Sequence, residues 1–257
     1  MPPFAPVLSH GLMPAWFEAC LYGLLGLVFG SFFGVVAHRV PEGRSIISPP
    51  SSCPACGHRL AAADLIPVLS YVLQRGRCRY CGTRFGIRYL AVEVASGALF
   101  VLAHYLAQGD VRLLLSGTLY LSLLLILFMT DLERMLLPDA ITLPGIVLGL
   151  IVAVAGWGVM DWRESLLGAV VGYGILAVVR IAARGALGGG DPKMLALIGA
   201  FLGPVGALKV LFWASVVGSV VGIALIVTKR HDRRAPFPYG PFLALGATVV
   251  LAMIRLS

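Results

Sequence analysis

Long runs of apolar residues follow one another along almost the whole chain of 257 residues. A helix needs about 20 residues to cross the hydrocarbon core of a membrane. Runs near this length predict eight spans, the sixth of them short: residues 15–37, 89–106, 113–129, 141–160, 165–183, 194–206, 208–228 and 239–256. The pattern predicts an all-α polytopic membrane protein with about eight transmembrane helices.

Composition agrees with this class. Hydrophobic residues make up 59% of the chain and charged residues 12%, and the mean hydropathy is +0.92, which excludes an ordinary soluble globular domain. The first apolar run starts late and has no basic leader or small-residue cleavage site, so we expect a retained helix and not a signal peptide. The first fourteen residues are expected to form a poorly ordered tail.

The distribution of Lys and Arg predicts the orientation, because short loops rich in these residues stay cytoplasmic. With the N-terminus outside, sixteen of the twenty basic residues fall in cytoplasmic segments. A re-entrant sixth segment is the alternative, but it would place the basic cluster at 229–234 outside. The net charge of +8 is then explained by loops beside anionic lipid heads, so the expected partner is membrane lipid and not nucleic acid.

Two aspartates stand at the ends of predicted spans. Asp131 ends the third span, and Asp191 precedes the sixth in the sequence GGGDPK. Ionisable side chains at such places are costly to keep and are functional candidates by default. In the preferred topology both lie at the cytoplasmic face, which suggests a pair. A phosphate-binding loop is the competing interpretation of the glycines, but the segment lacks the GKS or GKT ending.

The soluble insertion at residues 38–88 contains two CxxC knuckles. Cys53 and Cys56 form the first, Cys78 and Cys81 the second, and a glycine follows each knuckle. Four thiolates at this spacing suit a tetrahedral zinc ion, and a closed four-cysteine site is structural because it has no open position for water. Free or disulfide-linked cysteines are the alternative, which a reducing cytoplasm disfavours.

Three other charged residues allow two interpretations each. Lys193 either attracts a substrate carboxylate or anchors a helix end at the interface. Asp139 follows a proline ahead of an apolar run, which favours a helix cap over a catalytic role. Glu93 lies about one turn inside the second span and needs a partner, either an arginine of the insertion or a positive charge on a substrate or cofactor.

Several motifs together resemble the bacterial type IV prepilin leader peptidases, aspartyl membrane proteases with a GxGD motif that also process type II secretion pseudopilins. The resemblance covers about residues 22–245. Its motifs, in order, are GSFFGVVAHRVP (30–41), SCPACG (52–57), GRCRYCG (76–82), RYLAVE (88–93), Asp131 with LPDAITLP (137–144), GGGDPK (188–193) and PYGPFL (238–243). Two positions depart from the family: Gly34 stands where asparagine is common, and Pro192 where an aliphatic residue is usual.

The resemblance implies that Asp131 and Asp191 are catalytic. It implies cleavage of a prepilin or pseudopilin leader at the cytoplasmic face of the bacterial inner membrane, followed by N-methylation of the new N-terminus with S-adenosylmethionine. Two carboxylates that share a proton suit this chemistry, since one activates water and the other polarises the carbonyl. Gly188 and Gly190 would let the backbone approach a bound peptide closely, and Lys193 and Glu93 complete the expected substrate contacts.

The expected organisation has three parts. Residues 1–37 form the tail and first transmembrane helix, 38–88 the cytoplasmic four-cysteine insertion, and 89–257 the membrane-embedded peptidase core. Three alternatives remain open: a peptidase without methyl transfer, a transporter that uses its interface carboxylates, and a zinc-containing scaffold. A transporter would not need the cysteine-rich insertion, and a scaffold function would give the two aspartates no role.

Overall fold

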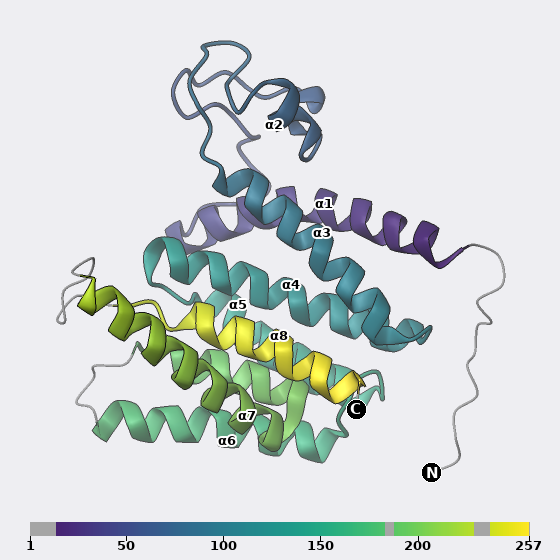
Figure 1. Cartoon of the computed structure of the whole chain (residues 1–257), viewed down its shortest axis with the longest axis vertical. Coiled ribbons are helices and arrows are strands. Elements are labelled where there is room, and N and C mark those ends of the chain that lie inside the picture. The colour runs from purple at the N-terminus through teal and green to yellow at the C-terminus, as the bar shows by residue number, and fades with distance from the viewer. Residues whose placement is uncertain (1–13, 183–187, 229–236, 257) are drawn as a thin grey trace. The chain divides into compact units, whose positions relative to one another are not determined.

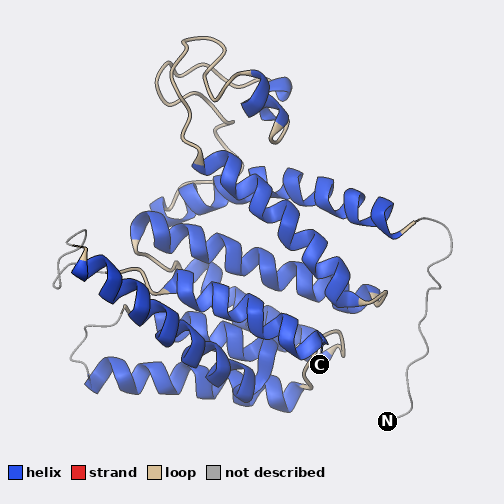
Figure 2. Ribbon diagram, viewed as in Figure 1, coloured by secondary structure: helices blue, strands red, loops and turns tan. Residues whose placement is uncertain are grey.

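The computed structural model describes residues 14–182, 188–228 and 237–256. Within these ranges the backbone forms eight α-helices and two short 3₁₀-helices, with no β-strand (Figure 2). Most of the expected N-terminal tail and the basic cluster at 229–234 lie outside the described residues. Two compact units, Met1–Asp110 and Val111–Ser257, make up the chain. The all-α class expected from the sequence is confirmed.

The first unit is built on two long helices, α1 (Ala15–Arg39) and α3 (Arg88–Ala107) (Figure 1). They pack closely because glycines face the neighbouring backbone. A Cβ on Gly26 would lie 2.7 Å from the Ser96 carbonyl oxygen, and one on Gly30 would lie 2.7 Å from the Cα of Glu93. Small residues allow this approach between membrane helices. The Gly30 contact also holds the beginning of α3, with Glu93, against α1.

The segment between these helices is mostly loop (Figure 2). It begins with η1 (Val40–Glu42), and further on it contains only η2 (Ala62–Leu65) and α2 (Leu69–Leu73) as regular elements. Between residues 43 and 87, all of which the structure describes, Cys53 and Cys78 are the only buried hydrophobic side chains. A segment of this size without an apolar core needs another source of stability, such as a metal ion.

The second unit contains five helices, α4 to α8 (Figure 1). Its centre is the first half of α7, where Met194, Leu195, Leu197 and Ile198 are fully buried. Helices α5, α6 and α8 all pack against α7, and α4 packs against α8. The bounds are α4 (Val111–Arg134), α5 (Asp139–Val154), α6 (Trp162–Ala182), α7 (Asp191–Val227) and α8 (Gly240–Leu256).

Helix α7 is broken at Gly203, which has φ 72° and ψ 178°. Glycine adopts this conformation without the steric cost that a side chain would bring. Pro204 follows and has no backbone N–H to continue the helical hydrogen bonds. The predicted runs 194–206 and 208–228 are therefore the two halves of one interrupted helix, and the interruption lies a few residues before the boundary that hydrophobicity placed.

Helices α6 and α7 meet backbone to backbone. A Cβ on Gly168 would overlap the carbonyl oxygen of Gly199, and one on Gly172 would lie 2.5 Å from the carbonyl oxygen of Leu195. Close contacts of this kind strengthen van der Waals packing in a membrane, where the hydrophobic effect does not drive helices together. The contact fixes the register of α6 against the helix that begins with Asp191.

Five helices of the described chain are long and apolar enough to cross a membrane, and two shorter apolar helices accompany them. The long ones are α1 with η1, α3, α4, α6 and α7; the shorter ones are α5 and α8. The protein is thus a multi-pass membrane protein. The number of eight spans stays a prediction.

Candidate active site and metal centre

Asp131 lies near the end of α4 and is only 5% exposed. Its Oδ2 accepts a hydrogen bond of 2.8 Å from the backbone N–H of Gly240, the first residue of α8. The first N–H groups of a helix have no partner within the helix and favour a negative group. A Cβ on Gly240 would lie 3.1 Å from the Cβ and Cγ of Asp131. Glycine is therefore needed for α8 to begin this close to the aspartate.

Asp191 is the first residue of α7 and is likewise 5% exposed. Its carboxyl accepts a hydrogen bond from the backbone N–H of Gly188. A Cβ on Gly188 would lie 2.8 Å from Asp191 Oδ2, and one on Gly190 would lie 2.5 Å from the Cβ of Leu137. The glycines before Asp191 thus let the chain fold back over the carboxyl and let α7 begin against the residues that follow α4.

The two carboxyl groups come together in the second unit. Asp191 interacts electrostatically with Asp131, and Tyr239, next to Gly240, interacts with Asp191. The Tyr239 hydroxyl is also 3.0 Å from the hydroxyl of Ser215. Two neighbouring carboxyls away from bulk water cannot both ionise easily and tend to share a proton. A carboxyl pair that shares a proton can act in acid–base hydrolysis.

Lys193 and Asp139 form an ion pair of 2.6 Å between Nζ and Oδ1. The pair joins the first turn of α7 to the first residue of α5, and more than half of the Asp139 side chain is exposed. Pro138 occupies the N-cap position and no side chain makes a capping hydrogen bond there, so the expected Asp139 cap is wrong. The carboxylate still lies in the first turn, where the helix dipole favours a negative charge.

The four cysteines of the insertion converge. Their Sγ atoms all lie within 4.8 Å of one another, and Cys53 Sγ and Cys81 Sγ are 3.8 Å apart. Tetrahedral zinc with Zn–S bonds of about 2.3 Å holds its sulfurs about 3.8 Å apart. Cys53 and Cys78 are buried, whereas Cys56 and Cys81 are exposed. The donor set and its spacing fit a metal ion bound at the surface of the insertion.

The two knuckles have the same backbone geometry. The N–H of Cys53 donates to the carbonyl of His58, and Gly57 donates back to Cys53; Cys78, Thr83 and Gly82 repeat this pattern. Gly57 and Gly82 have φ of 71° and 72°, a conformation that favours glycine. Cys81 Sγ is hydrogen-bonded to the Thr83 hydroxyl at 3.3 Å, and interactions with the side chain and backbone of Thr83 lower the pKa of Cys81 to about 6. Each turn therefore presents two sulfurs on one side.

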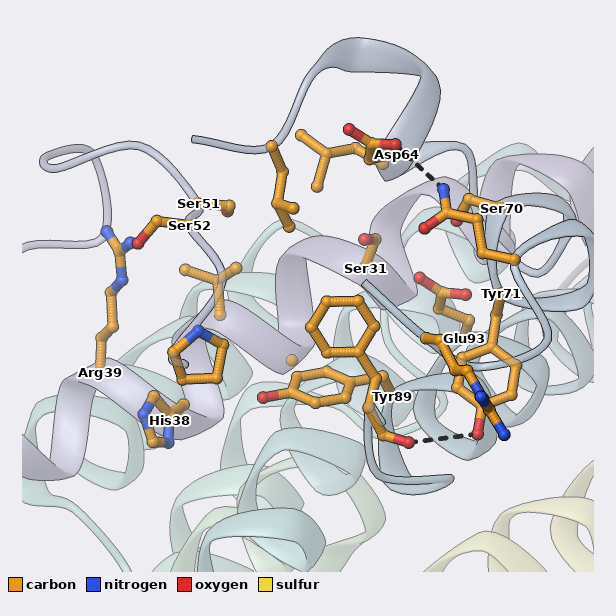
Figure 3. Close-up of a pocket in the computed structure, with 18 of the residues that line it drawn as sticks. Ser31, His38, Arg39, Ser51, Ser52, Asp64, Ser70, Tyr71, Tyr89 and Glu93 are labelled. Carbon is orange, nitrogen blue, oxygen red and sulfur yellow. Dashed lines mark hydrogen bonds between the residues drawn. The ribbon is translucent and has the colours of Figure 1, made fainter. Parts of the chain in front are cut away.

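Glu93 lies beside a cavity of the first unit, which Figure 3 shows. Its Oε2 accepts a hydrogen bond of 2.7 Å from the backbone N–H of Val68, and its carboxyl also accepts one from Ser31. An arginine of the insertion, one of the two partners that the sequence allows, is not among the hydrogen bonds and ion pairs found for Glu93 in the described chain. The structure thus places Glu93 in the first unit, while Gly188, Gly190 and Lys193 lie in the second with both aspartates.

Two family models match successive parts of the chain. The bacterial peptidase A24 N-terminal domain matches residues 24–107, and the type IV leader peptidase family matches residues 118–223. A protein of Bacillus subtilis (strain 168) named prepilin leader peptidase/N-methyltransferase is 36% identical, over 87% of this chain and 90% of its own length. Identity and coverage at this level establish membership.

The chain belongs to the type IV leader peptidase family. Two further relatives carry the same name. The protein of Aeromonas hydrophila is 35% identical over 95% of this chain and 93% of its own length. The protein of Myxococcus xanthus (strain DK1622) is 38% identical over 86% of this chain and 68% of its own length. No solved structure matches the chain.

Two residues beside the aspartates had no role assigned from the sequence, although the motif PYGPFL was noted. Gly240 donates its backbone N–H to Asp131, and Tyr239 lies within electrostatic range of Asp191. Both residues belong to this motif, and its glycine, which opens a long apolar run, is the signal that could have pointed to them. Both residues are far along the chain from the aspartates, so their spacing in the sequence does not predict the contact.

Proposed function

We propose that this family member is an aspartic endopeptidase that removes the leader of type IV prepilins or type II secretion pseudopilins. We propose further that it N-methylates the new N-terminus. The observation that supports cleavage best is the meeting of Asp131 and Asp191, both 5% exposed, from two helices of one unit. The relatives named prepilin leader peptidase/N-methyltransferase support both activities.

Asp131 and Asp191 act as base and acid in peptide hydrolysis. With one proton between them, the ionised carboxyl takes a proton from water while the protonated one donates to the scissile carbonyl oxygen. The Gly240 N–H fixes the orientation of Asp131, and the Gly188 N–H does the same for Asp191. Neither carboxyl needs a metal ion for this step. Hydrolysis then yields a free amine on the membrane-anchored product.

The substrate is a basic leader followed by an apolar helix, and the helix docks against the membrane bundle. Gly188 is exposed next to Asp191, and both Gly188 and Gly190 leave the backbone accessible to a peptide. Lys193 lies in the first turn of α7, two residues beyond Asp191, and its ammonium group, paired with Asp139, is available to attract a substrate carboxylate. Glu93 supplies a negative charge in the first unit for a cationic ligand.

Methylation uses S-adenosylmethionine as the methyl donor. The α-amine forms the new N–CH₃ bond with its lone pair, the S–CH₃ bond breaks with its electrons remaining on sulfur, and the amine releases one proton. The amine must be neutral to attack, so it has to lose its charge first. Cleavage must come before methylation because the full-length precursor has no free amine at that residue.

The four-cysteine cluster holds a structural zinc ion through Cys53, Cys56, Cys78 and Cys81. The near absence of buried apolar side chains in the insertion supports this role, because metal binding then supplies the folding energy that a hydrophobic core would otherwise give. With four thiolates the site has no open position for a substrate. Zinc therefore shapes the insertion and takes no part in hydrolysis.

We propose a bacterial inner membrane location, with the carboxyl pair facing the cytoplasm and the membrane lipid contacting the basic loops. The excess of Lys and Arg in the inner segments supports this orientation. No nucleic acid is needed to explain the charge. The leader of the substrate then lies on the same side as the aspartates.

One experiment tests both activities. Detergent-solubilised protein is incubated with a prepilin and labelled S-adenosylmethionine, and the pilin is examined for a mobility shift and for incorporated label. We expect both. A prepilin that stays uncut with the wild-type protein would contradict the peptidase assignment, whereas a cut pilin without label would leave a peptidase only. Asp131→Asn protein serves as the uncut reference.

A further inference from the structure

The first unit contains a cavity of about 440 Å³ that the proposed cleavage chemistry does not use. It is lined by residues of α1, the insertion and the beginning of α3, so all its walls belong to one unit. A volume of a few hundred cubic ångströms is typical of sites that bind small molecules. The cavity is therefore large enough for a nucleoside-sized ligand.

Acidic and basic side chains both line the cavity, and the basic ones include Arg44 and Arg77. Figure 3 shows Glu93 and Tyr71 on one side of the view and His38 and Arg39 on the other, with Ser31 between them. Three aromatic side chains, Tyr71, Phe85 and Tyr89, also line the cavity. Aromatic faces attract alkylated cations and stack on planar bases. A ligand with a cationic centre, a carboxylate and an aromatic base matches this distribution.

Glu93 is the carboxylate that can face such a cation. It accepts one hydrogen bond from the N–H of Val68 and one from Ser31, and a carboxylate has about four acceptor positions. Val68 has φ 61°, an unusual conformation for a β-branched residue, and this turn directs its N–H to Glu93. Strained backbone of this kind is concentrated at ligand-binding places.

Asp64, the other acidic residue of the lining, already has hydrogen-bond and ion-pair partners within the insertion. It accepts hydrogen bonds from the Ala61 N–H, the Gln74 amide and the Tyr80 hydroxyl, and it pairs with Arg79 at 3.2 Å. Burial opposes its ionisation, yet the Ala61 N–H and the Arg79 guanidinium together hold the pKa of Asp64 below its usual value. Glu93 is thus the carboxylate with capacity left for a ligand.

Gly34 leaves space in the wall of the cavity. A Cβ added there would meet no other atom within 4 Å. Gly34 lies inside α1, where glycine costs stability relative to residues with a side chain. The space at this position is consequently a property of the cavity and not a requirement of helix packing, unlike Gly26 and Gly30 on the same helix.

We infer that this cavity binds S-adenosylmethionine, with Glu93 facing the sulfonium, the aromatic residues holding the adenine, and the basic side receiving the carboxylate. The inference rests on the proposed methyl transfer and assigns its donor site to the first unit. Gly34 provides room for the ligand. Binding there is independent of the carboxyl pair, which lies in the other unit.

The test is direct binding, measured by isothermal titration calorimetry on the detergent-solubilised full chain. Gly34→Phe fills the cavity, and Glu93→Gln removes the charge but keeps an oxygen that can accept from Val68. We expect Gly34→Phe to abolish measurable binding of S-adenosylmethionine. Glu93→Gln should weaken it about tenfold or more, as for loss of a hydrogen bond or contact to a charged group.

S-adenosylhomocysteine, which lacks the methyl group and the sulfonium charge, provides the second probe. Glu93→Gln should weaken its binding less than that of S-adenosylmethionine, because the lost attraction is to the sulfonium. Two matched controls lie outside the cavity: Gly174→Phe, where a Cβ also meets nothing within 4 Å, and Glu164→Gln in the first turn of α6. Both should bind the donor like the wild-type protein.

Zinc content and elution as a single species show whether each variant is folded. If the wild-type protein binds the donor and both Gly34→Phe and Glu93→Gln bind it equally well, the cavity is not the donor site, while the proposed methyl transfer stands. If the wild-type protein binds neither probe, the methyl-transfer half of the proposed function fails and the inference fails with it. The two failures are thus distinguishable.

Discussion

The cysteine cluster and the aspartate pair are assembled in opposite ways. Each cysteine knuckle is closed by hydrogen bonds within a few residues of itself, and the same turn is repeated in the second knuckle. The aspartates come from α4 and α7, and the hydrogen bond from Gly240 to Asp131 joins residues 109 positions apart. The first site depends on local turns, whereas the second exists only when the helices of the second unit are packed.

This difference predicts how far the structural effect of a substitution extends. A change in a knuckle affects one small loop region, because few buried apolar side chains connect it to anything else. A change that moves α7 or α8 alters the geometry of the carboxyl pair directly. The experiments below test this contrast, beginning with the largest expected effect.

Replacing either aspartate should have the largest effect. Asp131→Asn and Asp191→Asn are close to isosteric but remove the acid or base, so we expect cleavage to fall at least about 10³-fold. Prepilin mobility on a gel measures this. The protein should remain inserted and elute as the wild type does. Near-normal cleavage by either variant would rule out the carboxyl-pair mechanism.

The order of the two reactions follows from the same pair. Asp191→Asn protein should put no label from S-adenosylmethionine on full-length prepilin, yet it should methylate a pre-cleaved pilin. The amine has an unperturbed pKa of roughly 7.7 to 8, so its neutral fraction, and with it the rate, should rise with pH through that range. Label on the uncut precursor would contradict this order, and a flat pH profile would show that the site lowers the pKa of the amine.

Loss of a knuckle should empty the metal site but spare part of the hydrolysis. We expect about one zinc per chain in protein purified without chelator, and much less in Cys53→Ser or Cys78→Ser. Elemental analysis measures the metal, and the mobility assay measures cleavage. The two variants should behave alike because the knuckles have the same geometry. Negligible zinc in the wild-type protein would show that the metal assignment is wrong.

A methyl group at Gly240 should have an intermediate effect. Gly240→Ala places a Cβ 3.1 Å from Asp131 Cβ, which is tighter than most such contacts, so α8 or the carboxyl must shift. We expect cleavage to fall about tenfold, as for a partly misplaced catalytic group. Gly246→Ala, on the same helix and away from Asp131, is the control. Equal activity of both variants would mean that the Gly240 contact does not position Asp131.

Breaking the Lys193–Asp139 pair should have the smallest effect. The pair is partly exposed, and such pairs contribute about 0.2 to 1 kcal/mol. Asp139→Asn should therefore change cleavage by no more than a few-fold, with added salt reducing the difference from the wild type. A loss as large as that of Asp131→Asn would instead make Asp139 a member of the catalytic pair.

Local features could be predicted from the sequence and distant contacts could not. The CxxC spacing and the glycine after each knuckle predicted the converging thiols, because the turn is determined within five residues. The apolar runs predicted the membrane helices. The Gly240 contact depends on the packing of α8 against α4, which no spacing encodes.

Two polar partners also escaped prediction for physical reasons. The sequence favoured a helix cap for Asp139, and it allowed Glu93 either an arginine of the insertion or a positive charge on a substrate or cofactor. Instead Asp139 accepts from Lys193, which another helix end brings near, and Glu93 accepts from a backbone N–H whose direction depends on the turn at Val68. Every residue except proline carries a backbone N–H, so the sequence does not show which of these groups will donate to a side chain.

The contact between α6 and α7 also determines where Asp191 lies along α6. Along the contact of α6 with α7, Gly168 faces Gly199 and Gly172 faces Leu195. A step of four residues toward the C-terminus of α6 thus corresponds to a step of four residues toward the N-terminus of α7. The next step places Asp191 level with Leu176, six residues before α6 ends at Ala182. At 1.5 Å per residue this difference is about 9 Å. In the proposed mechanism, water and the scissile bond therefore have to reach a carboxyl that lies beside the last turns of α6 and not beyond Ala182.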